Sequence, residues 1–221
     1  MNLSSFDPKI LNLYFIAGTQ DCRHLAGDRS EHLLNILHQA LQAGISCYQF
    51  RDKGAFSLQD NPSEQKQLAK ECQRLCQRYG VPFILNDMVE LAFELGVDGI
   101  HVGQGDKSII DIAQEMPKPM ILGLSVNTLE QARYWDSIPQ VSYFGTGPIF
   151  PTQSKSDQKP AVGIEFPKIL RQAGIQKPFV AIGGITHQSA QTLRTYGANG
   201  VAIISAITQA DNIITAVEQL K

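Results

Sequence analysis

The stretch SEHLLNILHQALQAGISCYQFRDK (30–53) contains one complete unit of helix, glycine and strand. Its first part carries Leu33, Leu37 and Leu41 among apolar residues spaced by three, four and seven, which predicts an amphipathic helix with one apolar face. Gly44 predicts the end of that helix, because glycine tolerates a positive φ. The segment after it is nearly all apolar until its end. This pattern is typical of a parallel strand buried on both faces.

The same unit recurs along the chain, with Gly80, Gly96, Gly174 and Gly197 before later apolar segments. Eight β–α units within 221 residues predict an α/β fold, a single (β/α)₈ TIM barrel with residues 1–221 as one domain. A doubly wound open sheet is the alternative. It is less favoured because no G-x-G-x-x-G follows the first strand. The strands are expected at 11–18, 46–52, 82–87, 99–104, 120–125, 143–150, 179–184 and 200–206.

The composition and charge of the chain indicate which kinds of partner and which compartment to expect. Charged residues make up 18% of the chain, the net charge is −2, and no run of like charges occurs, which argues against nucleic acid or a membrane surface as a partner. We expect a cytoplasmic protein with its four cysteines reduced, because the first residues do not resemble an export signal. A homo-oligomer is compatible with the sequence, since the outer helices of a barrel pack equally well against solvent or a partner.

The second expected strand ends in polar residues, at the end of the barrel that carries the functional sites. Gln49, Arg51 and Lys53 alternate with their neighbours and therefore share one side of the chain. Two cations and an amide aimed inward at the barrel top predict an anion site. The alternative is a solvated strand end in which Arg51 pairs with Asp52.

Two acidic residues end the next two strands. Asp87 follows Asn86 after the third strand, and Asp106 follows the fourth. Two carboxylates on adjacent strands could share Mg²⁺, which takes one or two carboxylates and completes its shell with waters and phosphate oxygens. The alternative is that each aspartate caps the helix that follows it.

The later strands carry the signs of a phosphate site. The loop 151–163 combines hydroxyls with a lysine and is a candidate lid, and the paired glycines 183–184 and Ser205 follow the last two strands, where barrels often bind phosphate. His101 lies inside a strand and is expected to be packed and hydrogen-bonded. With few groups suited to proton transfer, the residues predict two anion sites and one divalent-metal site, and a chemistry of positioning and electrostatics.

Seven of these stretches, in order, resemble the thiamine phosphate synthase family, and the resemblance covers nearly the whole chain. That family is a TIM barrel. It condenses 4-amino-2-methyl-5-(diphosphooxymethyl)pyrimidine with hydroxyethylthiazole phosphate, giving thiamine phosphate and diphosphate by a dissociative substitution that uses Mg²⁺. The matching stretches are YQFRDK (48–53), ILND (84–87), DGIHVGQGD (98–106), GLS (123–125), GTGPIFPTQSK (145–155), AIGGI (181–185) and GANGVAIISAI (197–207).

The resemblance also implies a role for each matching residue. It assigns one Mg²⁺ per site to Asp87 and Asp106. It implies that the electrostatic work of catalysis falls to Arg51, Lys53 and Lys155. The pyrimidine diphosphate would be held by Gln49, Arg51, Lys53, Asn86, Ser125 and Lys155, and the thiazole phosphate by Thr152, Ser154, Gly184, Ile204 and Ser205.

One position departs from the family pattern. Asn127 stands where the family often has a histidine, and an asparagine cannot act as a general base. A related thiazole tautomerase on the same barrel uses a histidine near that place, so the missing histidine favours the synthase. A second alternative is a non-catalytic barrel that binds thiazole phosphate. Its expected mark is loss of the metal carboxylates, and both are present.

Overall fold

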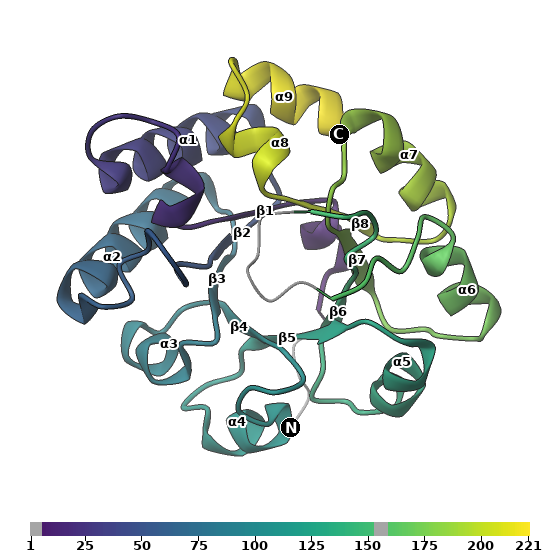
Figure 1. Cartoon of the computed structure of the whole chain (residues 1–221). Helices are drawn as coiled ribbons and strands as arrows, with labels where there is room; N and C mark the ends of the chain where they lie inside the picture. Colours follow the sequence, from purple (N-terminus) through teal and green to yellow (C-terminus); the bar gives the residue numbers. More distant parts are fainter. Residues whose placement is uncertain (1–5, 153–158) are drawn as a thin grey trace.

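The computed structural model describes residues 6–152 and 159–221. Within them, parallel strands close into a barrel in the order β1 to β8, and helices surround it, so the predicted (β/α)₈ barrel is confirmed (Figure 1). The strands are β1 (Leu13–Ala17), β2 (Cys47–Phe50), β3 (Phe83–Asn86), β4 (Gly99–Val102), β5 (Ile121–Val126), β6 (Tyr143–Thr146), β7 (Phe179–Ile182) and β8 (Gly200–Ile203).

The helices begin and end where the sequence carries stop and start signals. Gly44, Gly80 and Gly96 adopt left-handed conformations directly after three of them, as glycine at a helix end allows. The α-helices are α1 (Arg29–Ala43), α2 (Pro62–Tyr79), α3 (Val89–Leu95), α4 (Ile109–Glu115), α5 (Leu129–Asp136), α6 (Phe166–Gln172), α7 (His187–Thr195), α8 (Ser205–Thr208) and α9 (Ile213–Leu220). The 3₁₀ turns are η1 (Pro8–Leu11) and η2 (Thr19–Cys22).

Apart from β5, which ends one residue later than expected, the strands are shorter at their carboxyl ends than the apolar runs predict. The strand expected at 143–150 ends at Thr146, because Pro148 has no N–H to continue the ladder. The chain beyond it stays close to β7, since the N–H groups of Ile149 and Phe150 donate to carbonyls at the end of that strand, at 2.8 and 3.0 Å. The polar residues after each strand therefore lie on loops around the barrel top.

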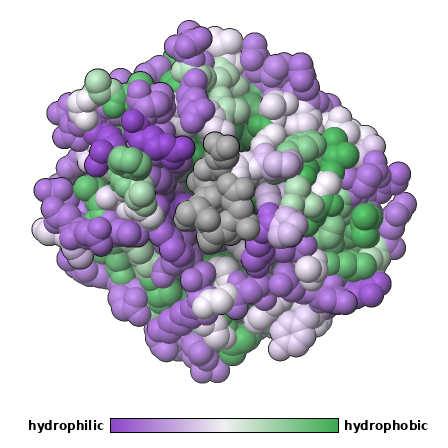
Figure 2. Space-filling view, viewed as in Figure 1, coloured by the Kyte–Doolittle hydropathy of each residue, from purple (hydrophilic) through white to green (hydrophobic). Residues whose placement is uncertain are grey.

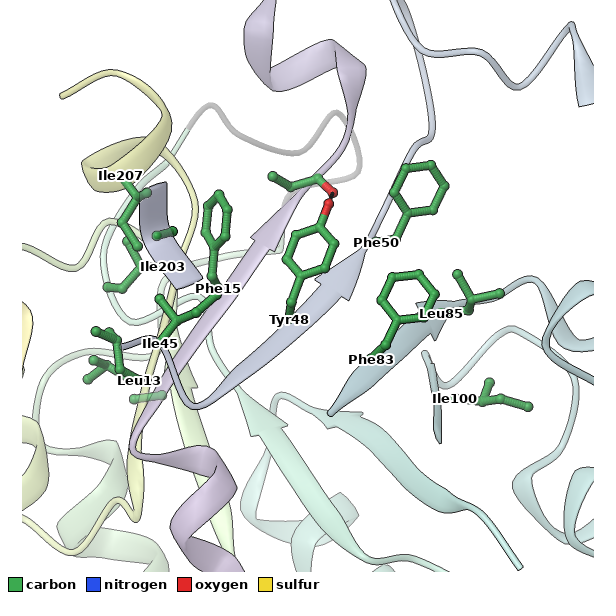
Figure 3. Close-up of a cluster of buried hydrophobic side chains, with 14 of the residues drawn as sticks. Leu13, Phe15, Ile45, Tyr48, Phe50, Phe83, Leu85, Ile100, Ile203 and Ile207 are labelled. Atoms are coloured by element: carbon green, nitrogen blue, oxygen red, sulfur yellow. Dashed lines mark hydrogen bonds between the residues drawn. The ribbon is translucent and has the colours of Figure 1, made fainter. Parts of the chain in front are cut away.

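Apolar side chains form two cores, one on each face of the closed sheet. The outward residues of the strands, among them Phe15, Tyr48 and Phe83, lie in the core between sheet and helices (Figure 3). The inward residues fill the barrel itself, with Tyr14 and Tyr143 the largest of them. The four cysteines are buried and free, as expected, and no described helix could cross a membrane.

Candidate functional site

A pocket of about 330 Å³ opens at the carboxyl ends of the strands. Its walls come from loops and strand ends all around the barrel, and hydrophilic residues dominate much of this face of the molecule (Figure 2). Ten residues from the sequence-based assignment line it: Arg51, Lys53, Asn86, Asp87, Asp106, Ser125, Thr152, Gly184, Ile204 and Ser205.

The polar residues at the end of β2 and directly after it lie at two depths. Gln49 is 2% exposed inside the barrel, where its Nε2 donates to the Tyr14 hydroxyl at 2.9 Å, and it does not line the pocket. Arg51, two residues further along the chain, lines the pocket although only 6% of it is exposed. A buried cation facing a pocket is suited to an anionic ligand, since the ligand replaces the lost hydration.

A buried carboxyl lies behind Arg51. Burial raises the pKa of Asp21 to about 6, while the Gly18 N–H and the charge of Arg51 oppose that rise. Asp52, the partner considered for Arg51 from sequence, directs its carboxylate to other donors: Thr19, Leu58 and Gln65 all donate to it, at 2.6–3.0 Å.

The two predicted metal carboxylates are neighbours. Burial is the largest cause of a raised pKa at Asp87, and the charge of Asp106 raises that pKa further. Lys53 Nζ lies 2.9 Å from Asp87 Oδ2 and opposes both effects. Asp87 also has a φ of +62°, which is rare for a residue other than glycine. This backbone conformation and the crowding of negative charge are both features of a site built for a ligand.

The helix-cap interpretation of these aspartates is wrong. The residue preceding α3 is Met88, which makes no side-chain cap, and α4 is capped by the Ser108 hydroxyl. Asp106 instead accepts the Gly103 N–H at 2.8 Å and so closes its own loop. Neither carboxylate is needed to start a helix.

The donor set around these carboxylates fits Mg²⁺ rather than a metal held wholly by protein. Among residues 6–152 and 159–221, no group of three or more His, Cys, Asp or Glu side chains is placed to hold an ion. Two carboxylates that border an open pocket leave room for waters and phosphate oxygens, which is how Mg²⁺ is usually bound with phosphate substrates.

Ser125, Asn127 and Lys159 form the wall across the pocket from Arg51. Ser125 Oγ lies 3.0 Å from His101 Nε2, so the histidine is hydrogen-bonded within the barrel, as expected. Asn127 donates to the Gly147 carbonyl and accepts from Lys159 Nζ at 2.8 Å. Sequence reasoning did not assign Lys159 to the pocket. Its only signal was its place in the same lysine-bearing loop after β6.

The turn after β7 packs tightly against the loop after β6. Gly183 and Gly184 have φ values of +104° and +62°. A Cβ at Gly184 would lie 2.8 Å from Phe150 Cβ and 2.9 Å from the Pro151 oxygen, so this glycine is required by packing as well as by its backbone conformation. Ser154 and Lys155, and with them the central part of the candidate lid 151–163, lie outside the described residues.

Comparisons with known proteins show which family the chain matches. The model of a family described as thiamine monophosphate synthase matches residues 13–207. The thiamine-phosphate synthase of Haemophilus influenzae is 55% identical over 213 residues, which cover 96% of this chain and 94% of that protein. The thiamine-phosphate synthase of Pasteurella multocida is 57% identical over 210 residues, with 95% of each chain covered.

Solved structures give the same result for the fold. A thiamine phosphate pyrophosphorylase from Pyrococcus furiosus superposes with a TM-score of 0.79 at 28% identity, and covers 96% of this chain and 95% of its own. A 3-hexulose-6-phosphate synthase superposes with a TM-score of 0.65 at 13% identity, which supports the barrel alone.

Proposed function

This chain belongs to the thiamine monophosphate synthase family and is a transferase of thiamine biosynthesis, and from that premise we propose how its barrel-top pocket performs the reaction. The substrates are the pyrimidine diphosphate and hydroxyethylthiazole phosphate, and the products are thiamine phosphate and diphosphate. One observation carries the proposal: a single pocket joins the cations Arg51 and Lys53, the carboxylates Asp87 and Asp106, and the glycine turn after β7.

The diphosphate end of the first substrate binds on the side of β2, β3 and β4. Arg51 supplies a buried guanidinium and Lys53 an ammonium, and both suit phosphate oxygens. Asn86 borders the same wall, and Gln49 and Lys155 remain assigned to this substrate by family resemblance. Gln49 would act from beneath the pocket, because its amide lies deeper in the barrel.

Asp87 and Asp106 would hold Mg²⁺. Partial burial and the charge of Asp106 both raise the pKa of the half-buried Asp87, and a cation between the two carboxylates would relieve their mutual repulsion. When bound, Mg²⁺ would supply positive charge to the diphosphate and so stabilise it as a leaving group. Lys53, already paired with Asp87, stands beside both the carboxylates and the proposed diphosphate position.

The thiazole phosphate binds on the opposite side, at the loops after β6, β7 and β8. Gly184 brings the backbone close to the pocket, and Thr152, Ile204 and Ser205 line the same region. Backbone N–H groups and hydroxyls of this kind suit a phosphate monoester. Ser154 completes the assignment by resemblance.

The reaction then depends more on where the site places its charges than on proton transfer. As the C–O bond to diphosphate breaks, negative charge grows on the leaving group, where Arg51 and Lys53 attract it more strongly than in the bound substrate. The electron-rich aminopyrimidine stabilises the methylene cation, and the thiazole nitrogen captures it. The protein must keep water away from that cation until the new C–N bond forms.

The tautomerase alternative lacks a base at the expected place. Asn127 faces the pocket as an amide committed to the Gly147 carbonyl and Lys159. A general base must accept a proton near neutral pH, and an amide does not. The carboxylate pair and the diphosphate-binding cations would also have no purpose in a reaction without diphosphate.

The direct test mixes the protein with both substrates and Mg²⁺ and follows thiamine phosphate and diphosphate. Arg51→Met should lower kcat/KM by about 10²–10³, since a charge-assisted contact at a leaving group is worth about 3–4 kcal/mol. Arg74→Met, on the exposed face of α2, is the matched control and should leave turnover unchanged. An active Arg51→Met variant would show that the diphosphate binds elsewhere.

A further inference from the structure

A row of hydrogen bonds crosses the barrel interior beneath the pocket. It runs from Gln49 Nε2 to the Tyr14 hydroxyl at 2.9 Å, and on to the Tyr143 hydroxyl at 2.7 Å. Tyr143 then lies 3.1 Å from His101 Nδ1, and His101 Nε2 lies 3.0 Å from Ser125 Oγ. All but Ser125 are at most 8% exposed, and Ser125 lines the pocket. We call these five residues the interior row.

Two glycines make room for this row. A Cβ at Gly123 on β5 would lie 2.4 Å from His101 Nδ1 and 2.5 Å from the Tyr143 hydroxyl. A Cβ at Gly145 on β6 would lie 3.0 Å from His101 Cε1. Any larger residue at these positions would displace the histidine–tyrosine pair. The barrel wall is therefore built around the pair.

The donors and acceptors give the row a direction. Gln49 contributes an N–H, so the Tyr14 oxygen accepts from it. Either hydroxyl could donate in the bond between Tyr14 and Tyr143, and in the direction inferred here the Tyr14 proton goes to Tyr143. Burial raises the pKa of both phenols, so both keep their protons at neutral pH. Tyr143 has then accepted one hydrogen bond and can donate its own proton to His101 Nδ1.

The consequence reaches the pocket through the histidine. An imidazole that accepts at Nδ1 is neutral and carries its proton on Nε2, so it donates to the Ser125 oxygen. The Ser125 proton must then point away from the histidine. No described residue accepts it, and the pocket that Ser125 borders is the remaining direction.

We propose that the interior row fixes Ser125 as a hydrogen-bond donor into the pocket, with His101 and Tyr143 as positioning residues. The inference rests on the proposed function, in which Ser125 contacts the pyrimidine diphosphate. A hydroxyl locked as a donor suits the oxygens of the diphosphate, whose acceptor strength grows as it leaves. The row removes the alternative orientation, in which the serine would present a lone pair to an anion.

A double-mutant cycle tests this directly. Ser125→Ala and Tyr143→Phe should each lower kcat/KM for the pyrimidine diphosphate by about tenfold, the usual effect of one lost hydrogen bond. If Tyr143 acts through Ser125, the double variant should be no slower than Ser125→Ala alone. Tyr48→Phe is the control, because it deletes a buried hydroxyl that donates to the Ala17 carbonyl outside the barrel, and it should leave kcat/KM unchanged.

The outcomes distinguish the positioning role of the interior row from the assignment of Ser125 to the substrate site. Losses that multiply in the double variant would overturn the interior row as a positioning device and leave the site assignment intact. A fully active Ser125→Ala would remove Ser125 from the substrate site, and the inference would fail with that assignment.

A spectroscopic measurement, begun on the wild-type protein, tests the direction of the row. Long-range ¹H–¹⁵N spectra of ¹⁵N-histidine protein distinguish the two neutral tautomers, and His101 should carry its proton on Nε2 at neutral pH. Tyr143→Phe should allow the other tautomer, because it removes the donor to Nδ1. A wild-type His101 protonated on Nδ1, or on both nitrogens, would reverse the direction of the row and refute the proposal.

Discussion

Asp21→Asn should make this protein more stable, although it removes a buried charged group. Asp21 is 7% exposed, and burial raises its pKa from 3.8 to about 6. A carboxyl with a raised pKa in the folded state costs stability once it ionises. About two pKa units correspond to about 3 kcal/mol, because each unit is worth about 1.4 kcal/mol.

The pH dependence follows from the same shift. Below the unfolded pKa of 3.8 the carboxyl is protonated in both states and costs nothing. Stability is lost as the pH rises to about 6, and the full cost remains above it. The advantage of Asp21→Asn in urea unfolding should therefore grow from about 1 kcal/mol at pH 4.5 to about 3 kcal/mol above pH 7.

Asp52→Asn is the matched comparison, since Asp52 is also buried and follows the same strand end. The Gly18 N–H and Gln20 Nε2 donate to the same oxygen of Asp21, and an asparagine keeps one such oxygen. Donors to Asp52 meet both oxygens, so an amide there would face at least one of them with its own N–H groups. Asp52→Asn should therefore cost about 2 kcal/mol at neutral pH.

The result that would refute this reasoning is a stability change of the same sign for both variants, or an Asp21→Asn effect that does not vary with pH. Because the negative charge of Asp21 offsets that of Arg51, which lines the pocket, the stabilised variant should bind the anionic pyrimidine diphosphate at least as tightly as the wild type.

Three further predictions concern the pocket. Exhaustive EDTA should abolish turnover and Mg²⁺ should restore it, with Asp87→Asn and Asp106→Asn raising the Mg²⁺ concentration needed for half-maximal rate; full turnover after chelation would exclude the metal site. Lys159→Met should lower kcat/KM by about tenfold while the melting temperature hardly changes, because Lys159 lines the pocket and makes one hydrogen bond at the surface. Gly184→Ala should cost about 2–4 kcal/mol of stability in urea unfolding, because of its left-handed φ and the 2.8 Å approach of the new Cβ to Phe150. Calorimetry should also find weaker binding of the thiazole phosphate. A fully stable variant would contradict the packing role of this glycine.

The fold could be predicted because its signals are local and repeated. A few residues are enough to identify an apolar strand, an amphipathic helix or a glycine that ends a helix, such as Gly44. Strand ends were less accurate, as at Thr146, because hydrophobicity continues into loops that pack on the barrel. The pocket walls followed from a topological rule, since the carboxyl ends of parallel strands meet on one face.

The rest of the site depends on contacts that no local pattern encodes. Tyr14 and Tyr143 meet across the barrel although 129 positions separate them in sequence. In the sequence nothing distinguishes Asp21 from other polar residues of turns, because its pKa is raised only once η2 buries it behind Arg51. Asn127 drew attention as a departure from the family, but its contact with Lys159 required the folded loops.

The glycines at 123 and 145 constrain how this lineage can change. A mutation that adds a methyl group at either position collides with His101, and a mutation that removes the imidazole leaves a cavity beside the two glycines. Each single substitution at these positions should therefore destabilise the barrel, whereas simultaneous substitution of the glycines and the histidine need not. Substitutions at these sites should be strongly epistatic. Transplanting the histidine–tyrosine pair into another barrel would accordingly require the glycines to be installed first.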